Sequence, residues 1–94
     1  MKLVWLPTAI ENRDALIEYI AQENPKAAIE HDDRIEKQTD QLVVHPELGR
    51  LGRKRGTREL VISQTHFVVV YRVKTKTKRI EVWRVLHSSQ AWPA

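Results

Sequence analysis

The sequence contains no cysteine and only three glycines among its 94 residues. Without cysteine, the chain can form neither a disulfide framework nor a thiolate metal site, which fits a reducing compartment. The N-terminus also lacks a signal-peptide pattern and an apolar stretch of membrane length, because Pro7 and Glu11 interrupt the first hydrophobic residues. We therefore expect a cytoplasmic protein that does not interact with membranes.

Metal and cofactor sites are not indicated either. The histidines show no ligand spacing, such as a pair four residues apart on one helix. They stand at positions 31, 45, 66 and 87. We therefore expect neither a metal nor a cofactor. A chain of this length has room for one hydrophobic core, so we expect a single domain over residues 1–94.

Charge is divided unequally between the two halves of the chain, although the net charge is only +4. Residues 1–44 hold five Lys or Arg against nine Asp or Glu, whereas residues 45–94 hold eleven against three. We expect the second half to meet an anionic partner, while the first half is either solvated or faces something basic.

The most informative stretch of the sequence is a basic loop at residues 49–58. It contains all three glycines, and glycine allows a loop to bend sharply or to approach another group closely. Its five cations repel one another unless water, salt or an anionic partner screens them. They are Arg50, Arg53, Lys54, Arg55 and Arg58. Two interpretations are open: a solvated loop that keeps the protein soluble, or a surface that binds an anionic target.

Two helices are predicted in the first half. A strand at residues 2–6 is followed by Thr8-Ala9-Ile10-Glu11, which has the form of a capping box and predicts a helix with Thr8 as its N-cap. Asn24-Pro25 ends this helix and begins a second, because Asn is a favoured N-cap and Pro suits the first helical position. The second helix is predicted to run to about Val44, so the two helices form a hairpin.

Three strand patterns follow and lie at residues 58–62, 67–73 and 79–86. Their short polar links predict an antiparallel meander, with the apolar middle run as a central strand. Strict alternation in the last strand places Arg84 on one face with Ile80 and Val82, and His87 on the other. The expected fold is α+β, with the order β-α-α-β-β-β and an N-terminal helical hairpin packed on a small antiparallel sheet.

The aromatic residues of the second half are assigned to packing. Tyr71 and Trp83 lie within strands and are expected in the core, and Trp92 is expected to pack back on the domain. For Arg72 two roles remain open, an ion pair and a phosphate contact.

Four motifs occur in order along nearly the whole chain: HPELGR at residues 45–50, GTRELV at 56–61, VYRV at 70–73 and RVLH at 84–87. In this order they resemble the RelE/ParE superfamily of toxins from bacterial type II toxin–antitoxin modules. The ending Gln90-Ala91-Trp92-Pro93 is similar to the branch labelled RelE/StbE or ParE-like. The resemblance implies a small toxin that a cognate antitoxin holds inactive in a toxin–antitoxin hetero-oligomer.

The superfamily combines one fold with two activities. RelE-type members cut mRNA in the ribosomal A site, whereas ParE-type members are not nucleases and poison DNA gyrase. RNA cleavage needs a general base, a general acid and cations for the phosphate. The resemblance gives Arg58 and His87 these roles if the chain is a nuclease. However, the positions where the ribonuclease pattern has cations are occupied by Leu60, Val68 and Ser88.

These departures favour a ParE-like toxin that poisons DNA gyrase without nuclease activity. One alternative is a RelE-like, ribosome-dependent mRNA endonuclease that uses Arg58, the basic loop and His87, so enzymatic activity stays open. His87 has a structural interpretation too, as a cap on the end of its strand. A second alternative is a small non-toxic nucleic-acid-binding module. The candidate contacts to the target or its phosphates are Arg50, Arg53, Lys54, Arg55 and Arg58.

Overall fold

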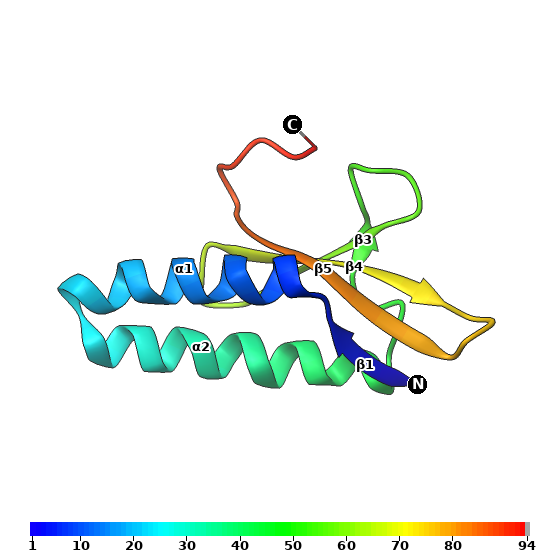
Figure 1. Ribbon diagram of the computed structural model, residues 1–94, viewed down its shortest axis with the longest axis horizontal. Helices are drawn as coiled ribbons and strands as arrows, with labels where there is room; N and C mark the ends of the chain where they lie inside the picture. Colours follow the sequence, from blue (N-terminus) through cyan, green and yellow to red (C-terminus); the bar gives the residue numbers. More distant parts are fainter. Residues whose placement is uncertain (94) are drawn as a thin grey trace.

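A helical hairpin packs on one face of a mixed five-stranded sheet (Figure 1). The structure is a computed structural model that describes residues 1–93. Its elements are β1 (Lys2–Trp5), α1 (Pro7–Glu23), α2 (Pro25–Asp40), the 3₁₀ turn η1 (Gln41–Val43), β2 (Arg50–Leu51), β3 (Arg58–Val61), β4 (Phe67–Lys74) and β5 (Arg79–His87). The α+β prediction is confirmed, and one short strand, β2, is added to it.

Both helices begin at a proline. The N-cap of α1 is Leu6, which makes no side-chain hydrogen bond, so the capping box predicted at Thr8 is wrong. Pro7 takes the first helical position and places Thr8 inside the first turn. At α2 the prediction is confirmed, because Asn24 Oδ1 accepts a hydrogen bond from the Ala27 N–H at 3.0 Å. Within residues 1–93, neither helix is long and apolar enough to span a bilayer.

The strand order in the sheet is β1-β5-β4-β3-β2. β3, β4 and β5 form the predicted antiparallel meander, but β1 pairs in parallel with β5, so the sheet is mixed. The parallel pair is possible because the chain between β1 and β5 forms a long crossover connection. β2 has only two residues, which is too few for a pattern of alternation to reveal it.

The core lies between the helical hairpin and one face of the sheet, which we call the helix face; the opposite face is the outer face. The buried cluster comprises Ala9, Ile35, Leu42, Leu60, Ile62, Phe67, Val69, Tyr71, Ile80, Val82 and Val85. Burying one large apolar side chain of this kind contributes about 2 kcal/mol. Tyr71 is fully buried, so its predicted core position is confirmed.

A β-bulge in β5 changes which side chains share a face. Along β5, pairing with β4 jumps from Val82 to Arg84, so Trp83 is the extra residue. Beyond it, Val85 joins Val82 in the buried cluster, while Arg84 lies on the outer face. His87 follows Val85 onto the helix face beside Phe67. The predicted alternation, with Arg84 on the face of Val82, is therefore wrong beyond the bulge.

One edge of the sheet, just after β3, is closed by a side chain of α2. The Ser63 N–H donates to Gln38 Oε1 at 2.8 Å, and Gln38 Nε2 donates to the Ser63 carbonyl at 3.4 Å. The amide of Gln38 therefore occupies the place that a neighbouring strand would take.

Candidate functional site

One buried carboxylate folds the basic loop against the outer face of the sheet. Glu59 on β3 is 1% exposed and accepts hydrogen bonds from the Arg53 N–H at 2.8 Å, from Arg53 Nε at 3.1 Å and from Arg50 Nη2 at 3.3 Å. Burial alone would raise the pKa of Glu59, but the hydrogen bonds from Arg53 and Arg50 outweigh it and hold that pKa below the ordinary value of a glutamate. Two of the loop's cations are therefore paired within the protein.

The lowered pKa of Glu59 predicts how stability depends on pH. Because the folded pKa lies below the unfolded value of about 4.3, the carboxylate stabilises the fold fully above about pH 4.3. This contribution is lost as the pH falls from there through the folded pKa. We expect the difference in free energy of unfolding between wild type and Glu59→Gln, measured by urea unfolding, to shrink over this window. A difference that does not change with pH would contradict the role of Glu59.

The tip of the basic loop is a compact turn that leaves one cation free. The Gly52 N–H donates to the Thr57 carbonyl at 2.8 Å, and Thr57 Oγ1 donates to the Lys54 carbonyl at 2.5 Å. Gly56 has a φ of +83°, which a residue with a side chain rarely adopts. Arg55 lies exposed beside it and forms no ion pair or hydrogen bond within residues 1–93.

Three cations of the outer face lie over tryptophan rings. Arg72 lies 4.2 Å from the Trp83 centroid, Lys54 Nζ lies 5.9 Å from the centroids of both Trp83 and Trp92, and Arg84 lies 5.5 Å from that of Trp92. We call these five residues the cation–aromatic ladder. It joins the sheet, the basic loop and the C-terminal segment, both of which rise from the side of the sheet away from the helices (Figure 1).

The ladder shows where the aromatic residues of the second half and Arg72 lie, so their predicted positions can be compared with the structure. Trp92 is half-buried and packs back on the domain, as predicted. Trp83 is half-buried on the outer face, so the prediction of a core position is wrong: the residue alternates with Val82, which faces the helices, and follows Glu81 onto the other face. Arg72 forms no ion pair within residues 1–93; its guanidinium lies over the ring of Trp83.

Arg58 is separated from the other cations of the basic loop. It pairs with Tyr71 across the strands, and its Nη1 donates to the Gly49 carbonyl at 2.8 Å and to the Glu47 carbonyl at 3.5 Å. The Gly49 N–H in turn donates to Tyr71 Oη at 2.8 Å, and Tyr71 Oη donates to the Pro46 carbonyl at 2.7 Å. Burial raises the pKa of Tyr71 above 10.0, so its hydroxyl stays protonated. Arg58 and Tyr71 together fasten the segment before β2.

His87 belongs to a different cluster. Its ring stacks on His66 with centroids 5.6 Å apart and meets Phe67 edge-on at 6.4 Å. Its Nδ1 accepts a hydrogen bond from the Ser89 N–H at 3.2 Å, which fits the interpretation of a cap at the strand end. A cavity of about 260 Å³ opens here, lined by Leu16, Tyr19, Ile20, His31, His66, Phe67 and His87. No group of three His, Cys, Asp or Glu side chains in residues 1–93 is arranged to hold a metal ion.

The two candidate nuclease residues do not share a site. His87 pairs with Phe67 at the start of β4, whereas Arg58 pairs with Tyr71 four residues further along the same strand. Four residues of a strand span about 13 Å. Each side chain is also occupied locally, Arg58 by backbone carbonyls and His87 by Ser89 and His66.

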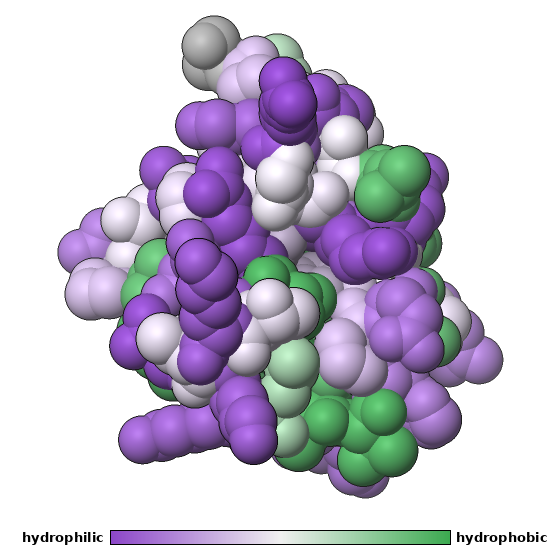
Figure 2. Space-filling model, turned by 90° about the vertical axis from the view of Figure 1, so that its right-hand side faces the viewer, coloured by the Kyte–Doolittle hydropathy of each residue, from purple (hydrophilic) through white to green (hydrophobic). Residues whose placement is uncertain are grey.

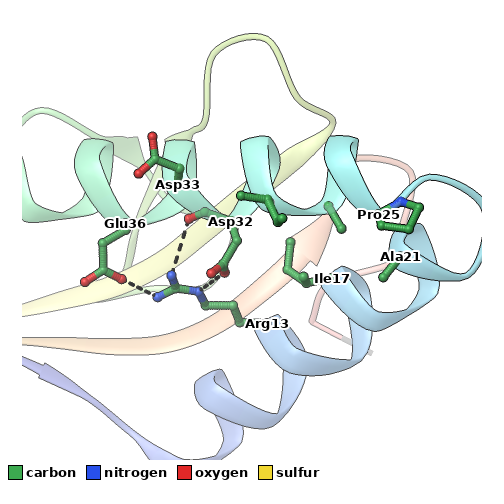
Figure 3. Close-up of a pocket in the computed structure, with 9 residues that line it drawn as sticks. Arg13, Ile17, Ala21, Pro25, Asp32, Asp33 and Glu36 are labelled. Carbon is green, nitrogen blue, oxygen red and sulfur yellow. Dashed lines mark hydrogen bonds and ion pairs between the residues drawn. The ribbon is translucent and has the colours of Figure 1, made fainter.

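The acidic half of the chain forms a groove between the two helices (Figure 3). Arg13 of α1 reaches across it, with Nε 2.7 Å from Asp32 and Nη1 2.8 Å from Glu36 of α2. The guanidinium also lies 4.8 Å from the ring of Trp5 on β1. The hydrogen bonds and ion pairs to Asp32 and Glu36 outweigh burial and raise the pKa of Arg13. Arg13 therefore ties three elements together and neutralises part of the acidic surface.

Sequence reasoning found the basic loop but missed the ladder. The structure brings Arg50, Arg53 and Lys54 together on the outer face and places Arg58 elsewhere. The count of charges in residues 45–94 could have indicated the ladder, because eleven cations cannot all pair with three carboxylates. Cations without carboxylate partners need other neighbours, and two tryptophans lie in the same half of the chain.

Comparisons with known proteins agree on one family. The sequence matches the family described as "ParE toxin of type II toxin-antitoxin system, parDE" over residues 3–92. It is 33% identical over 92 residues to "Putative toxin Y4kP" of Sinorhizobium fredii, which covers 98% of this chain and 93% of that protein. The fold is similar to a solved structure described as "Chromosomal ParDE TA system from P. aeruginosa", with a TM-score of 0.82 and 27% identity over 93% of this chain and 95% of that chain. The chain therefore belongs to the ParE toxin family of type II toxin–antitoxin systems, within the RelE/ParE superfamily.

Proposed function

We propose that this toxin stops bacterial growth by poisoning DNA gyrase in the cytoplasm and that a cognate antitoxin neutralises it. Its membership of the ParE family supports both parts of the proposal. Gyrase acts on DNA, so a gyrase–DNA complex presents the anionic groups that the basic half of the chain is suited to meet.

The distance between Arg58 and His87 is the observation that favours a mechanism without RNA cleavage. A general acid or base must lie within hydrogen-bond reach of the group that it serves, and the cations must reach the same phosphate. Here the two residues pair with positions four residues apart along β4, and Arg58 is fastened to backbone carbonyls. One scissile phosphate would not contact both.

The outer side of the basic loop is the proposed contact with the target. Arg55 is fully available at the tip, and the side chains of Arg50 and Arg53 remain 62% and 39% exposed despite their pairing with Glu59. Lys54 completes the contact above the tryptophans. Arg58 contributes by holding the segment from which β2 begins.

The proposed antitoxin contact lies beside this surface. Exposed apolar side chains gather near η1, β2 and β3, namely Val43, Val44, Leu48, Leu51 and Val61. Figure 2, which faces the right-hand side of Figure 1, shows hydrophobic patches on an otherwise hydrophilic surface. An extended or helical antitoxin segment that carries acidic and apolar residues would match this combination and would fold as it binds.

Expression of the toxin without its antitoxin tests the proposal. We expect DNA synthesis to stop while a reporter mRNA stays intact, and purified gyrase to lose supercoiling activity. Arg55→Glu should weaken gyrase inhibition about tenfold, because a charge reversal at the contact repels the anionic target. Lys76→Glu, in the exposed turn between β4 and β5, makes the same charge change away from the contact and should leave inhibition unchanged.

The same experiment identifies the alternatives. Loss of translation with codon-positioned cuts in the mRNA, abolished by His87→Ala, would establish a RelE-like endonuclease and overturn the proposal. Growth without any defect, together with binding of nucleic acid, would indicate the non-toxic binding module. Equal effects of Arg55→Glu and Lys76→Glu would remove the basic loop from the contact.

A further inference from the structure

The three cations of the cation–aromatic ladder have no anionic partner among the residues that the structure describes. The carboxylates of the outer face are already engaged, Glu59 by Arg50 and Arg53 and Glu81 by Arg79. Within residues 1–93, no carboxylate lies within ion-pair distance of the three ladder cations, which are Lys54, Arg72 and Arg84. The outer face therefore concentrates positive charge that no carboxylate of residues 1–93 neutralises.

Tryptophan rings hold these cations but leave hydrogen-bond donors unused. A ring face attracts a cation through its π electrons and accepts few hydrogen bonds, so N–H groups at its edge need a further acceptor. Arg72 Nε and Trp92 Nε1 are both buried and have no hydrogen-bond partner within residues 1–93. Both atoms are closed off from the surface, so the feature of the ladder that an external ligand can meet is its positive charge.

The three unpaired cations of the ladder have the chemistry that binds phosphate. Guanidinium groups form forked hydrogen bonds to phosphate oxygens, and an ammonium group such as that of Lys54 adds a point charge. The cations come from the sheet and from the basic loop, which rises with the C-terminal segment from this side of the sheet (Figure 1), so a polyanion would meet positive charge from two parts of the chain.

We propose that the cation–aromatic ladder binds the phosphate backbone of duplex DNA. Single-stranded nucleic acid is held by stacking bases on free aromatic rings, but the rings of Trp83 and Trp92 already carry the protein's own cations. A duplex presents its phosphates outward and needs no free ring. The inference rests on the proposed function and deepens it, because it names the DNA in the gyrase complex as a direct contact of the toxin.

Binding of the purified toxin to a short labelled DNA duplex, measured by anisotropy over a range of salt concentrations, tests the inference. Arg72→Gln combined with Arg84→Gln should weaken binding at least about tenfold and reduce the slope of log affinity against log salt by about two. The matched control is Lys76→Gln with Lys78→Gln, which removes the same charge from the exposed β4–β5 turn. It should leave the slope nearly unchanged.

A second variant keeps the test valid if the double variant folds poorly. Arg84→Lys keeps the charge, and because only a planar guanidinium forms the forked contact, we expect an unchanged salt slope with weaker affinity. The emission of Trp83 and Trp92 should change when duplex is added to wild type. Equal loss in the ladder and control pairs would overturn the inference, as would tighter binding of single-stranded DNA or RNA than of duplex.

Failure of this inference is distinguishable from failure of the proposed function. If the ladder double variant no longer binds duplex but still poisons gyrase fully, the DNA contact is refuted while gyrase poisoning stands. If wild type binds duplex through the ladder but leaves gyrase active, the contact stands and the proposed target is refuted.

Discussion

Replacing Glu59 with glutamine should lower the free energy of unfolding by about 2 kcal/mol. The Glu59 side chain is fully buried and is the carboxylate to which Arg50 and Arg53 bind. Glutamine is nearly the same size but carries no charge, so both arginines lose their counter-ion. Their side chains are 62% and 39% exposed and can turn towards water, which keeps the loss below that of a fully buried pair.

Urea unfolding at neutral pH measures this effect, with Glu47→Gln as its matched control. Glu47 is exposed, and its carboxylate forms no ion pair within residues 1–93, so the control should change stability by less than about 0.5 kcal/mol. Similar losses in both variants would show that Glu59 does not anchor the basic loop. The amide of Arg53 should also exchange faster with solvent in Glu59→Gln, because it donates to Glu59 at 2.8 Å.

Gly49→Ala should destabilise the fold by about 3 kcal/mol. An added Cβ would lie 2.7 Å from both Cε1 and Oη of Tyr71 and 2.9 Å from the carbonyl oxygen of Glu59. Neither neighbour can move freely, because the Tyr71 ring is fully buried and Glu59 lies within β3. The clash also breaks the hydrogen bond from the Gly49 N–H to Tyr71 Oη.

Thermal unfolding of three variants separates this clash from a general cost of replacing glycine. Gly56→Ala meets only ordinary contacts with Arg72 at 3.7 Å, so its cost should be about 1 kcal/mol from the positive φ alone. Tyr71→Phe removes the hydroxyl, and its effect should not add to that of Gly49→Ala, because the two residues are in contact. Strict additivity of the two effects would contradict the proposed clash.

The sequence predicted the elements whose signals are local. Asn24-Pro25 predicted the junction of the two helices, because Asn is a favoured N-cap and Pro suits the first helical position. The apolar run of β4 indicated a central strand. The bulge at Trp83 has no local signal, because it arises from the way β5 pairs with β4. A one-residue shift of this kind exchanges the two faces of a strand. It therefore changed the predicted surroundings of Arg84 and Val85 together.

The candidate site was predictable in composition but not in arrangement. The excess of cations at residues 49–58 was visible in the sequence. Which of them are free depends on one acidic residue, Glu59, whose burial follows from the fold. Likewise, Arg58 belongs to the same run of residues, yet strand alternation turns it away from Glu59 and towards Tyr71.

The side-chain amide of Gln38 has a consequence for the protein at high concentration. An open sheet edge is a template on which strands of other molecules can add, and repeated addition produces fibres. Beside Ser63, both backbone groups are already occupied by an amide that offers no continuation to a further strand. The backbone groups of Ser63 are therefore not free to start the addition of a further strand.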